Sequence, residues 1–178
     1  FLLHILMKLD YKLEIIHCNF CLRESESDGD QDFVKEFALN NNIKIHTKSF
    51  DTLGFAKKEK ISTQMAARDL RYLYFEEIRT ISNCDHIVIA HTSDDNVETF
   101  FINLTRGTGL KGLSGIRKKN KKIVRPILSI ARNEISEYVN LNNISYREDS
   151  SNIKSNYIRN NFRNNIFPLL SEINPSFK

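Results

Sequence analysis

Cysteine is scarce in this chain, with three residues in 178. An odd and sparse set argues against a disulfide framework and favours a reducing compartment, the cytoplasm. Cys18 and Cys21 form a C-x-x-C pair, but no second pair follows, and a zinc site would need ligands beyond His17. We therefore interpret the spacing of this pair as chance.

Apolar segments long enough to cross a membrane are also lacking. The apolar stretch Phe1–Met7 is too short to span a bilayer and has neither the basic leader nor the cleavage site of a signal peptide. It is interpreted as part of a helix, and no membrane partner is expected. Because the first residue is Phe rather than Met, we expect a segment of the protein upstream of it.

Negative charge is sparse in the second part of the chain. Residues 106–178 carry a net charge of +9, whereas residues 1–105 carry −5. This asymmetry points to a polyanion as the partner of the second part. The alternative is a solvated basic face, and on charge alone that alternative is the better interpretation.

What the chain does contain, 40% hydrophobic and 27% charged residues, suits a folded domain with a sizeable core. Short β-branched runs alternate with stretches of helical period, which predicts an α/β fold with a parallel sheet flanked by helices. The strands are expected near residues 13–18, 43–49, 86–90 and 123. The helices are expected over residues 32–39, 65–78, 95–105, 132–141 and 157–170. The Lys/Arg run 117–122 is expected to be a flexible surface loop.

The segment Ala90–Thr99 lies where a predicted strand meets the start of a helix, the end of an open α/β sheet at which ligands bind. Asp94, Asp95 and Glu98 are spaced so that their carboxylates can share one helix face. Carboxylate oxygens suit a Mg²⁺ ion that also holds ATP phosphates. The alternative is an ordinary capping box, which taken alone is the better interpretation.

The glycine-rich stretch 106–112 matches the sequence pattern G-x-G-x-x-G but not the structural context of that pattern. A dinucleotide fingerprint follows a strand, whereas this stretch follows a predicted helix, so we reject that interpretation. A helix C-cap followed by an adaptable loop remains, in which Arg106 and the backbone N–H groups of Gly107 and Gly109 could meet phosphate.

Arg68 and Arg71 are three residues apart on a predicted helix and can point the same way. Guanidinium groups bind phosphate through two parallel hydrogen bonds, so the pair could clamp a nucleotide. Surface ion pairs with Asp69 or Glu76 are the alternative, and without context that alternative is favoured.

Taken together, the order of these segments resembles the tRNA(Ile)-lysidine synthase family almost from end to end. The segments that carry the resemblance are His17–Arg23, Ala66–Tyr72, His91–Thr99, Leu104–Leu113, Arg125–Leu128, Glu148–Asn152 and Arg159–Leu170. Each is common individually, but their shared order is highly specific.

The resemblance implies a Rossmann-like fold of the N-type ATP pyrophosphatase (PP-loop) class, followed by a small helical extension. It implies an enzyme that uses ATP and Mg²⁺ to adenylate the wobble cytidine of tRNA(Ile) with a CAU anticodon, after which free L-lysine displaces AMP. By this likeness His91, Asp95 and Glu98 belong to the catalytic site, and His17 and Asn19 lie near the adenine. The same likeness implies that four further residues face phosphate or the target nucleotide: Arg71, Arg106, Gly107 and Gly109.

The resemblance also divides the chain by role. Residues 1–116 correspond to the ATP-binding α/β part, and residues 117–178 to a basic, mainly helical extension of the same domain that contacts tRNA. The residues expected to contact tRNA are Lys118, Lys119, Lys121, Lys122, Arg125, Arg132, Arg159 and Arg163. The oligomeric state is left open, with a homodimer as one alternative.

The chain departs from the family pattern at its first residue. The Ser-Gly-Gly-x-Asp-Ser loop that cradles pyrophosphate in the family is expected just upstream of Phe1, and none of the six glycines rebuilds it. Further tRNA-binding domains are expected after Lys178. We therefore expect these 178 residues by themselves not to turn over ATP. The remaining alternatives are a related PP-loop enzyme that thiolates tRNA and a non-catalytic RNA-binding module.

Overall fold

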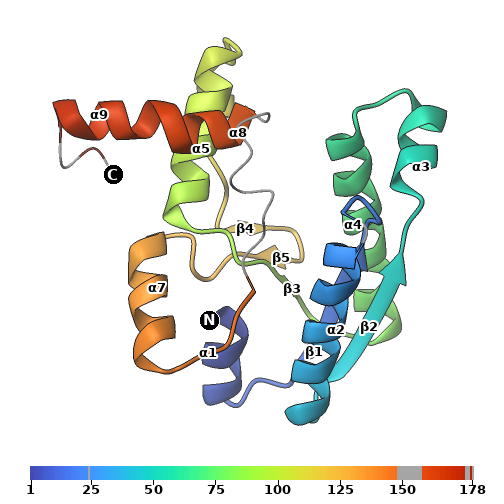
Figure 1. The fold of residues 1–178 in the computed structure, drawn as a ribbon. Coiled ribbons are helices and arrows are strands. Elements are labelled where there is room, and N and C mark those ends of the chain that lie inside the picture. The colour runs from blue at the N-terminus through green and yellow to red at the C-terminus, as the bar shows by residue number, and fades with distance from the viewer. Residues whose placement is uncertain (24, 148–157, 175–176, 178) are drawn as a thin grey trace. The chain divides into compact units, whose positions relative to one another are not determined.

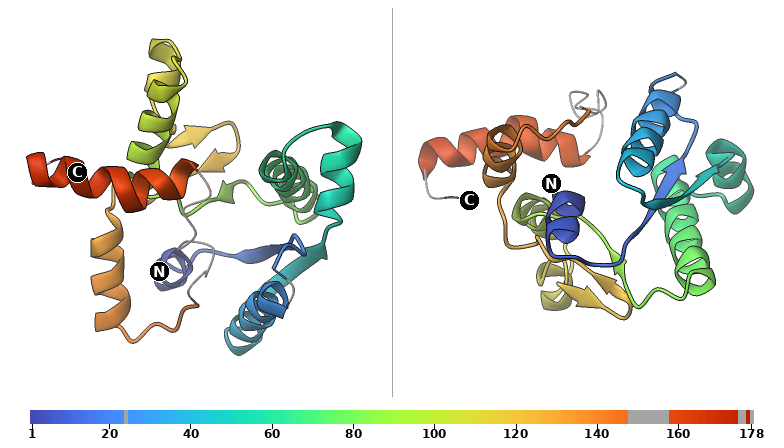
Figure 2. Two further views of the ribbon diagram at one scale, coloured as in Figure 1. Left: turned by 45° about the horizontal axis from the view of Figure 1, so that its top comes forward. Right: turned by 90° about the horizontal axis from the view of Figure 1, so that it is seen from below.

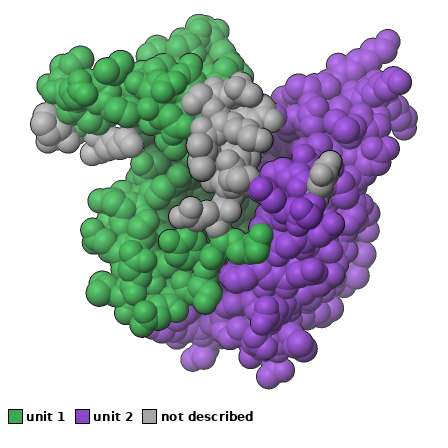
Figure 3. Space-filling view, in the orientation of Figure 1, with its two compact units in different colours: residues 1–2, 88–178 green, residues 3–87 purple. Residues whose placement is uncertain are grey.

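The computed structural model describes residues 1–23, 25–147, 158–174 and 177. The chain forms two compact units, shown in Figure 3. Unit 2 comprises Leu3–Ile87, and unit 1 comprises Phe1–Leu2 together with Val88–Lys178. The motif segment Glu148–Asn152 lies outside the described residues. The predicted division after residue 116 separates an ATP-binding part from a tRNA-contacting part. It is a division by role and not by compact unit, and it stays a prediction.

Unit 2 is built on two parallel strands, β1 (Glu14–Asn19) and β2 (Lys44–Ser49), whose register pairs Glu14 with Lys44 and Asn19 with Ser49. The connection between them is a helix that contacts both strands, as β-α-β units require. Figures 1 and 2 show the strands side by side with helices flanking them. The helices of this part are α1 (Leu2–Lys8), α2 (Ser25–Asn40), α3 (Thr52–Glu59) and α4 (Thr63–Ile81).

Helix α4 begins at a serine cap and packs through small and apolar residues. The Ser62 hydroxyl accepts a hydrogen bond from the Met65 backbone N–H, which satisfies one of the unpaired donors of the first turn. Ala67, Tyr74 and Ile78 recur at helical spacing and are buried. The predicted helix 65–78 is therefore confirmed and is extended at both ends.

The first residue of β1 joins the sheet to the end of α4. The Glu14 carboxylate accepts hydrogen bonds from the Ser82 hydroxyl at 2.5 Å and from Lys44 Nζ at 3.3 Å, and His46 Nε2 lies 2.7 Å away. The Ser82 hydrogen bond is the largest of the effects that lower the pKa of Glu14 from 4.5 to about 2. Glu14 is thus an ionised anchor between strand and helix.

We expect Glu14→Gln to lower the free energy of unfolding by about 1–2 kcal/mol near pH 7, because charge-assisted hydrogen bonds become neutral ones. The Glu14 carboxyl group binds a proton more weakly in the folded chain than in the unfolded one. Its contribution is therefore complete above about pH 5 and is lost as the pH falls towards 2. Urea unfolding at pH 7 and pH 3 measures this difference. The exposed Glu59→Gln is the matched control, and equal losses for both variants would contradict the prediction.

Unit 1 combines a small three-stranded sheet with helices. Strands β4 (Lys119–Asn120) and β5 (Ile123–Val124) pair antiparallel, and the order in the sheet is β3-β5-β4, with β3 (Ile87–Val88) at the unit boundary. The helical elements are α5 (Ser93–Thr105), α6 (Leu110–Leu113), α7 (Arg132–Leu141), α8 (Ile158–Asn161), η2 (Phe162–Ile166) and α9 (Phe167–Ile173). Figures 1 and 2 show α8, η2 and α9 as one continuous rod.

The core of unit 1 lies between α5 and this rod. Ile102 from α5 packs with Phe162 and Phe167, and Val97 and Phe101 extend the same cluster. Phe167 is 1% exposed and is among the most deeply buried large side chains of the described residues. The packing fixes the rod against the helix that carries Asp95 and Glu98.

Two sequence predictions need correction. The strand predicted over 86–90 is reduced to Ile87–Val88, and its partner is β5. The run 117–122 is not a structureless loop, because Lys119–Asn120 form β4 and Lys121 makes the turn with a φ of 52°. Lysine on an edge strand keeps that edge from pairing with other chains, so a high charge does not exclude a strand there. Among the described residues no helix is both long and apolar enough to cross a membrane.

Candidate functional site at the start of α5

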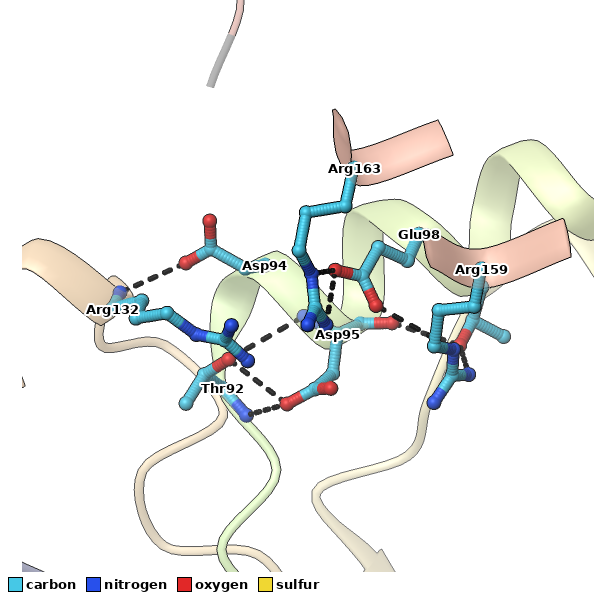
Figure 4. A network of polar contacts seen from close by, with 8 residues as sticks. Thr92, Asp94, Asp95, Glu98, Arg132, Arg159 and Arg163 are labelled. Carbon is cyan, nitrogen blue, oxygen red and sulfur yellow. Dashed lines mark hydrogen bonds and ion pairs between the residues drawn. The ribbon is translucent and has the colours of Figure 1, made fainter. Parts of the chain in front are cut away.

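The start of α5 is held by a capping box. The Thr92 backbone N–H and hydroxyl donate to Asp95 Oδ2 at 2.8 and 2.9 Å, and the Asp95 N–H donates back to Thr92 Oγ1 at 3.4 Å. A capping box is therefore present, but it pairs Thr92 with Asp95, whereas the sequence interpretation expected an Asp or Ser with the Glu three residues on. The box does not use the whole side chain, because both of these hydrogen bonds go to Oδ2 (Figure 4) and none is found to Oδ1 among the described residues. One carboxylate oxygen thus remains available to a ligand.

Glu98 lies one turn further along α5 and is 1% exposed. Its Oε1 accepts a hydrogen bond from Arg163 Nε at 2.7 Å, and its Oε2 is 3.5 Å from Arg159 Nε (Figure 4). Oε2 is buried and has no hydrogen-bond partner among the described residues. Burial raises the pKa of Glu98 above its ordinary value, and the two arginines oppose that effect. The site therefore holds a desolvated carboxylate beside two guanidinium groups.

Asp94 does not join the other two carboxylates. Its Oδ2 accepts from the Arg132 backbone N–H at 2.8 Å, while the Ser93 N–H donates to the Ile130 carbonyl oxygen at 3.0 Å. These bonds tie the start of α5 to the start of α7. Within the part of the chain that the structure describes, no group of three or more His, Cys, Asp or Glu side chains could hold a metal ion. A metal site shared by Asp94, Asp95 and Glu98 therefore stays a prediction.

His91 is oriented by a buried arginine. Arg125 is 7% exposed, and its Nε donates to His91 Nδ1 at 3.0 Å while Nη1 donates to the Arg117 carbonyl oxygen at 2.9 Å. Because an arginine N–H can only donate, Nδ1 of His91 must be the acceptor and Nε2 carries the ring proton in the neutral form. Arg125 thus orients the His91 ring, and its predicted contact with tRNA stays a prediction.

The glycine-rich stretch closes α5 as a C-cap. The Arg106 N–H donates to the Ile102 and Asn103 carbonyl oxygens at 3.2 Å, and Gly107 has a φ of 66°, the left-handed conformation that glycine adopts without strain. Arg106, Gly107 and Gly109 are exposed, as an anion contact requires. The C-cap prediction is confirmed, and the phosphate contact stays a prediction.

The other predicted site residues belong to unit 2. Asn19 is buried at the end of β1, where its Nδ2 donates to Asp28 Oδ1 at 2.9 Å. His17 is partly buried, and desolvation is the largest cause that lowers its pKa. Arg71 lies 5.1 Å from the centre of the Phe20 ring, whereas Arg68 stacks on Tyr72 at 5.0 Å. The two guanidinium groups thus stack on different rings, and Arg71 is the one beside the end of β1.

Cys18 lies on the same strand and is chemically quiet. Desolvation is the main cause that raises the pKa of its thiol to about 11. The thiolate is the nucleophilic and metal-binding form of cysteine, so a raised pKa disfavours both roles. The interpretation of the C-x-x-C spacing as chance is consistent with this environment.

Apart from Arg125, the residues predicted to contact tRNA fall into two groups. Lys118, Lys119, Lys121, Lys122 and Arg132 are exposed. Arg159 and Arg163 instead face Glu98, which no sequence spacing could reveal because 61 or more positions separate them from it along the chain. Sequence reasoning also missed Thr92, although a threonine three positions before an acidic residue is the usual signal of such a cap.

Comparison with known proteins identifies relatives along almost the whole chain. Residues 1–170 match the family model of the PP-loop domain. The chain is 46% identical over 175 residues to a tRNA(Ile)-lysidine synthase of Parabacteroides distasonis, covering 98% of the chain and 40% of that protein. It is 45% identical over 177 residues to that of Bacteroides thetaiotaomicron, covering 99% of the chain and 42% of that protein. The chain spans about two fifths of the length of these curated relatives.

A solved structure shows the same fold. The U34-tRNA thiolase NcsA from Methanococcus maripaludis, determined with its [4Fe-4S] cluster, superposes with a TM-score of 0.74 at 18% identity, covering 98% of this chain and 62% of that one. At this identity the likeness concerns the fold alone. It confirms the predicted Rossmann-like arrangement with a parallel sheet flanked by helices.

Proposed function

The chain belongs to the PP-loop domain family, and from that premise we propose that it is the nucleotide-binding part of a tRNA(Ile)-lysidine synthase. The single observation that carries the proposal is the identity of 44–46% with curated synthases over nearly all of the chain. The proposed reaction transfers AMP from ATP to the wobble cytidine of tRNA(Ile) with a CAU anticodon. The amino group of free L-lysine then displaces AMP. The proposed compartment is the cytoplasm.

The start of α5 suits the first of these steps. Mg²⁺ in proteins usually binds one or two carboxylates together with substrate phosphates, so Asp95 Oδ1 is sufficient as a protein ligand when the nucleotide brings the ion. Such an ion supplies charge neutralisation at the phosphates. Arg159 and Arg163 add positive charge beside Glu98, and a preorganised charge in a site with little water stabilises a developing charge strongly. The His91 ring, held in one orientation by Arg125, suits a contact with the base or with a phosphate.

The test uses the full-length protein with ATP, Mg²⁺, L-lysine and tRNA(Ile). We expect AMP release that depends on both lysine and tRNA, and mass spectrometry of the digested tRNA should show a lysine adduct on the wobble cytidine. Residues 1–178 expressed alone should release no pyrophosphate. A full-length protein that binds the tRNA but never releases AMP would favour the RNA-binding module instead.

A thiolating enzyme of the same fold is the second candidate, and the cysteines count against it. Three free cysteines are present, and the pKa of Cys18 is raised by burial rather than lowered. A cluster-binding or sulfur-transferring thiol needs the opposite environment. Iron analysis of anaerobically purified protein distinguishes the two, since the proposed synthase contains none.

The four exposed lysines near β4 supply a test of the tRNA surface. We expect their replacement by glutamine in the full-length protein to weaken tRNA binding and to reduce the slope of log affinity against log salt by about one for each phosphate that is no longer neutralised. ATP binding should not change. Filter-binding titrations at several salt concentrations measure both quantities. The residues replaced are Lys118, Lys119, Lys121 and Lys122.

The matched control removes the same number of charges from exposed lysines of unit 2. Its tRNA slope should equal that of the unchanged protein. If the two quadruple variants gave the same slope, the lysines near β4 would be no more than a solvated turn. The control residues are Lys35, Lys57, Lys58 and Lys60.

A further inference from the structure

The glycine-rich segment Arg106–Gly115, here called the glycine loop, is fastened to α5 at two points. Near its end, Asn96 Oδ1 accepts a hydrogen bond from the Ile116 backbone N–H at 2.6 Å. Near its middle, Asn103 Nδ2 donates to the Gly112 carbonyl oxygen at 2.8 Å. The Asn103 carbonyl oxygen also accepts from the Thr108 N–H at 3.2 Å.

The spacing of the two asparagines suits this arrangement. They are seven residues apart, which is about two turns, so both side chains leave α5 on the same face. That face differs from the one that carries Asp95 and Glu98, because successive residues are rotated by about 100°. Helix α5 thus presents the candidate site on one face and holds the glycine loop with another.

The fit at Gly115 shows how closely the loop approaches. A Cβ atom on Gly115 would lie 2.3 Å from Asn96 Oδ1, and the φ of this glycine is 69°. A residue with a side chain would be strained there on both counts. Meanwhile Gly107 and Gly109 have open space around them. The loop is therefore tight where it is fastened and open where it faces solvent.

We propose that Asn96 and Asn103 are positioning residues that hold the glycine loop in one conformation, so that Arg106 and the neighbouring glycines meet a phosphate group without first being ordered. This proposal rests on the proposed function, which assigns phosphate chemistry to the loop. When a loop is already fixed before binding, the ligand does not have to order it. The entropic cost of ordering then no longer weakens the affinity. The phosphate belongs either to ATP or to tRNA, and the experiment separates the two.

The two asparagines use opposite ends of their amides, which allows a crossed test. Asn96→Asp keeps the oxygen that accepts from Ile116. Asn103→Asp replaces the donor by an oxygen that repels the Gly112 carbonyl. Both changes add one negative charge to the same helix face, but the charge at position 103 lies nearer to Arg106. Asn103→Ala, which removes the donor without adding a charge, is therefore measured beside them, and an effect that Asn103→Asp and Asn103→Ala share reports the fastening.

Trypsin cleavage after Arg106 and Lys111, followed by mass spectrometry of the full-length protein, measures the order of the loop. We expect Asn103→Asp to be cut at these bonds about fivefold faster than the unchanged protein, the factor expected when one hydrogen bond is removed. Asn96→Asp should stay close to the unchanged protein. Asn41→Asp is the control, because Asn41 Nδ2 donates to the Phe37 carbonyl oxygen at 2.8 Å in the same way but far from the loop in sequence.

Binding is measured in separate titrations with ATP alone and with tRNA alone. One of the two ligands, ATP or tRNA, carries the phosphate that the loop contacts. Asn103→Asp should lower the affinity for that ligand by about fivefold more than Asn96→Asp does. Gly115→Ala disturbs the other fastening point from the loop side and should reproduce the faster cleavage, with circular dichroism confirming that each variant is folded.

Cleavage of Asn103→Asp at the unchanged rate would overturn the proposal. So would faster cleavage with both affinities equal to those of Asn96→Asp, because the fastening would then be structural only. Neither the cleavage measurement nor the binding measurement uses lysine. If the unchanged protein had no lysine-dependent synthase activity, the proposed function would fail while these two measurements still tested the loop.

Discussion

Asp95→Asn in the full-length protein is expected to reduce the rate of lysine-dependent AMP release by on the order of 100-fold while the protein stays folded. The side-chain oxygen of asparagine can still accept from the Thr92 N–H and hydroxyl, which now hold Asp95 Oδ2 at 2.8 and 2.9 Å. Only the negative charge is removed. A carboxylate that binds the magnesium of the nucleotide loses that function with its charge, whereas a cap does not.

Thr92→Ala provides the opposite change, because it removes a capping hydroxyl and leaves the Asp95 charge. Loss of such a cap lowers the free energy of unfolding by about 1 kcal/mol. If Asp95 were only a cap, Asp95→Asn would keep both its melting temperature and its activity, whereas Thr92→Ala would melt earlier and stay active. Initial rates of AMP release and thermal melting curves, measured on the same preparations, distinguish these outcomes.

Sequence periodicity was sufficient where an element carries its own signal. The apolar pattern of 132–141 predicts α7 with its observed bounds, and the β-branched runs near 13–18 and 43–49 predict β1 and β2 to within one residue. Helix α3 escaped prediction because it has only eight residues and Gly54 in its first turn lowers its helix propensity. Its Asp51 cap, which accepts from the Gly54 N–H, was the available signal.

The candidate site was only partly predictable, since its geometry depends on contacts between distant segments. Spacing correctly places Asp95 and Glu98 on one helix, yet Asp94 is drawn away by the backbone of Arg132, 38 positions along the chain. The family resemblance, which the comparisons confirm, directed Arg159 and Arg163 to tRNA. Their contact with the buried Glu98 comes from the packing of the rod on α5, and no local pattern encodes it.

That packing depends on a π-helical turn. Phe162 and Phe167 are five residues apart, and on an α-helix such residues diverge by about 140° around the axis. Within η2 the Phe167 N–H donates to the Phe162 carbonyl oxygen, the i to i+5 bond of a π-helix, and this wider turn brings both rings towards α5. Arg163 follows Phe162 directly and so reaches Glu98. The apolar cluster and the charged contact are products of the same turn.

Phe167→Ala is therefore expected to lower the free energy of unfolding of unit 1 by about 3–5 kcal/mol, the cost of a large cavity in a packed core. The ring is 1% exposed and lies 5.5 Å from Phe101, 5.8 Å from Phe162 and 5.7 Å from Phe177 between ring centres. Denaturant unfolding measures the loss. Leu169→Ala, on the same helix and 59% exposed, is the matched control and should change the free energy of unfolding by less than about 0.5 kcal/mol.

The same variant tests whether the core and the site are coupled. Loosening the rod removes the support of Arg163, so Glu98 loses the hydrogen bond that Arg163 donates at 2.7 Å. A buried carboxylate without its partner is costly, and amide hydrogen exchange should accelerate over Ser93–Thr105 as well as over the rod. Leu169→Ala should leave both segments protected. If Phe167→Ala accelerated exchange in the rod while α5 stayed protected, the rod would be an appendage of unit 1, and Arg163 would have no part in holding the site.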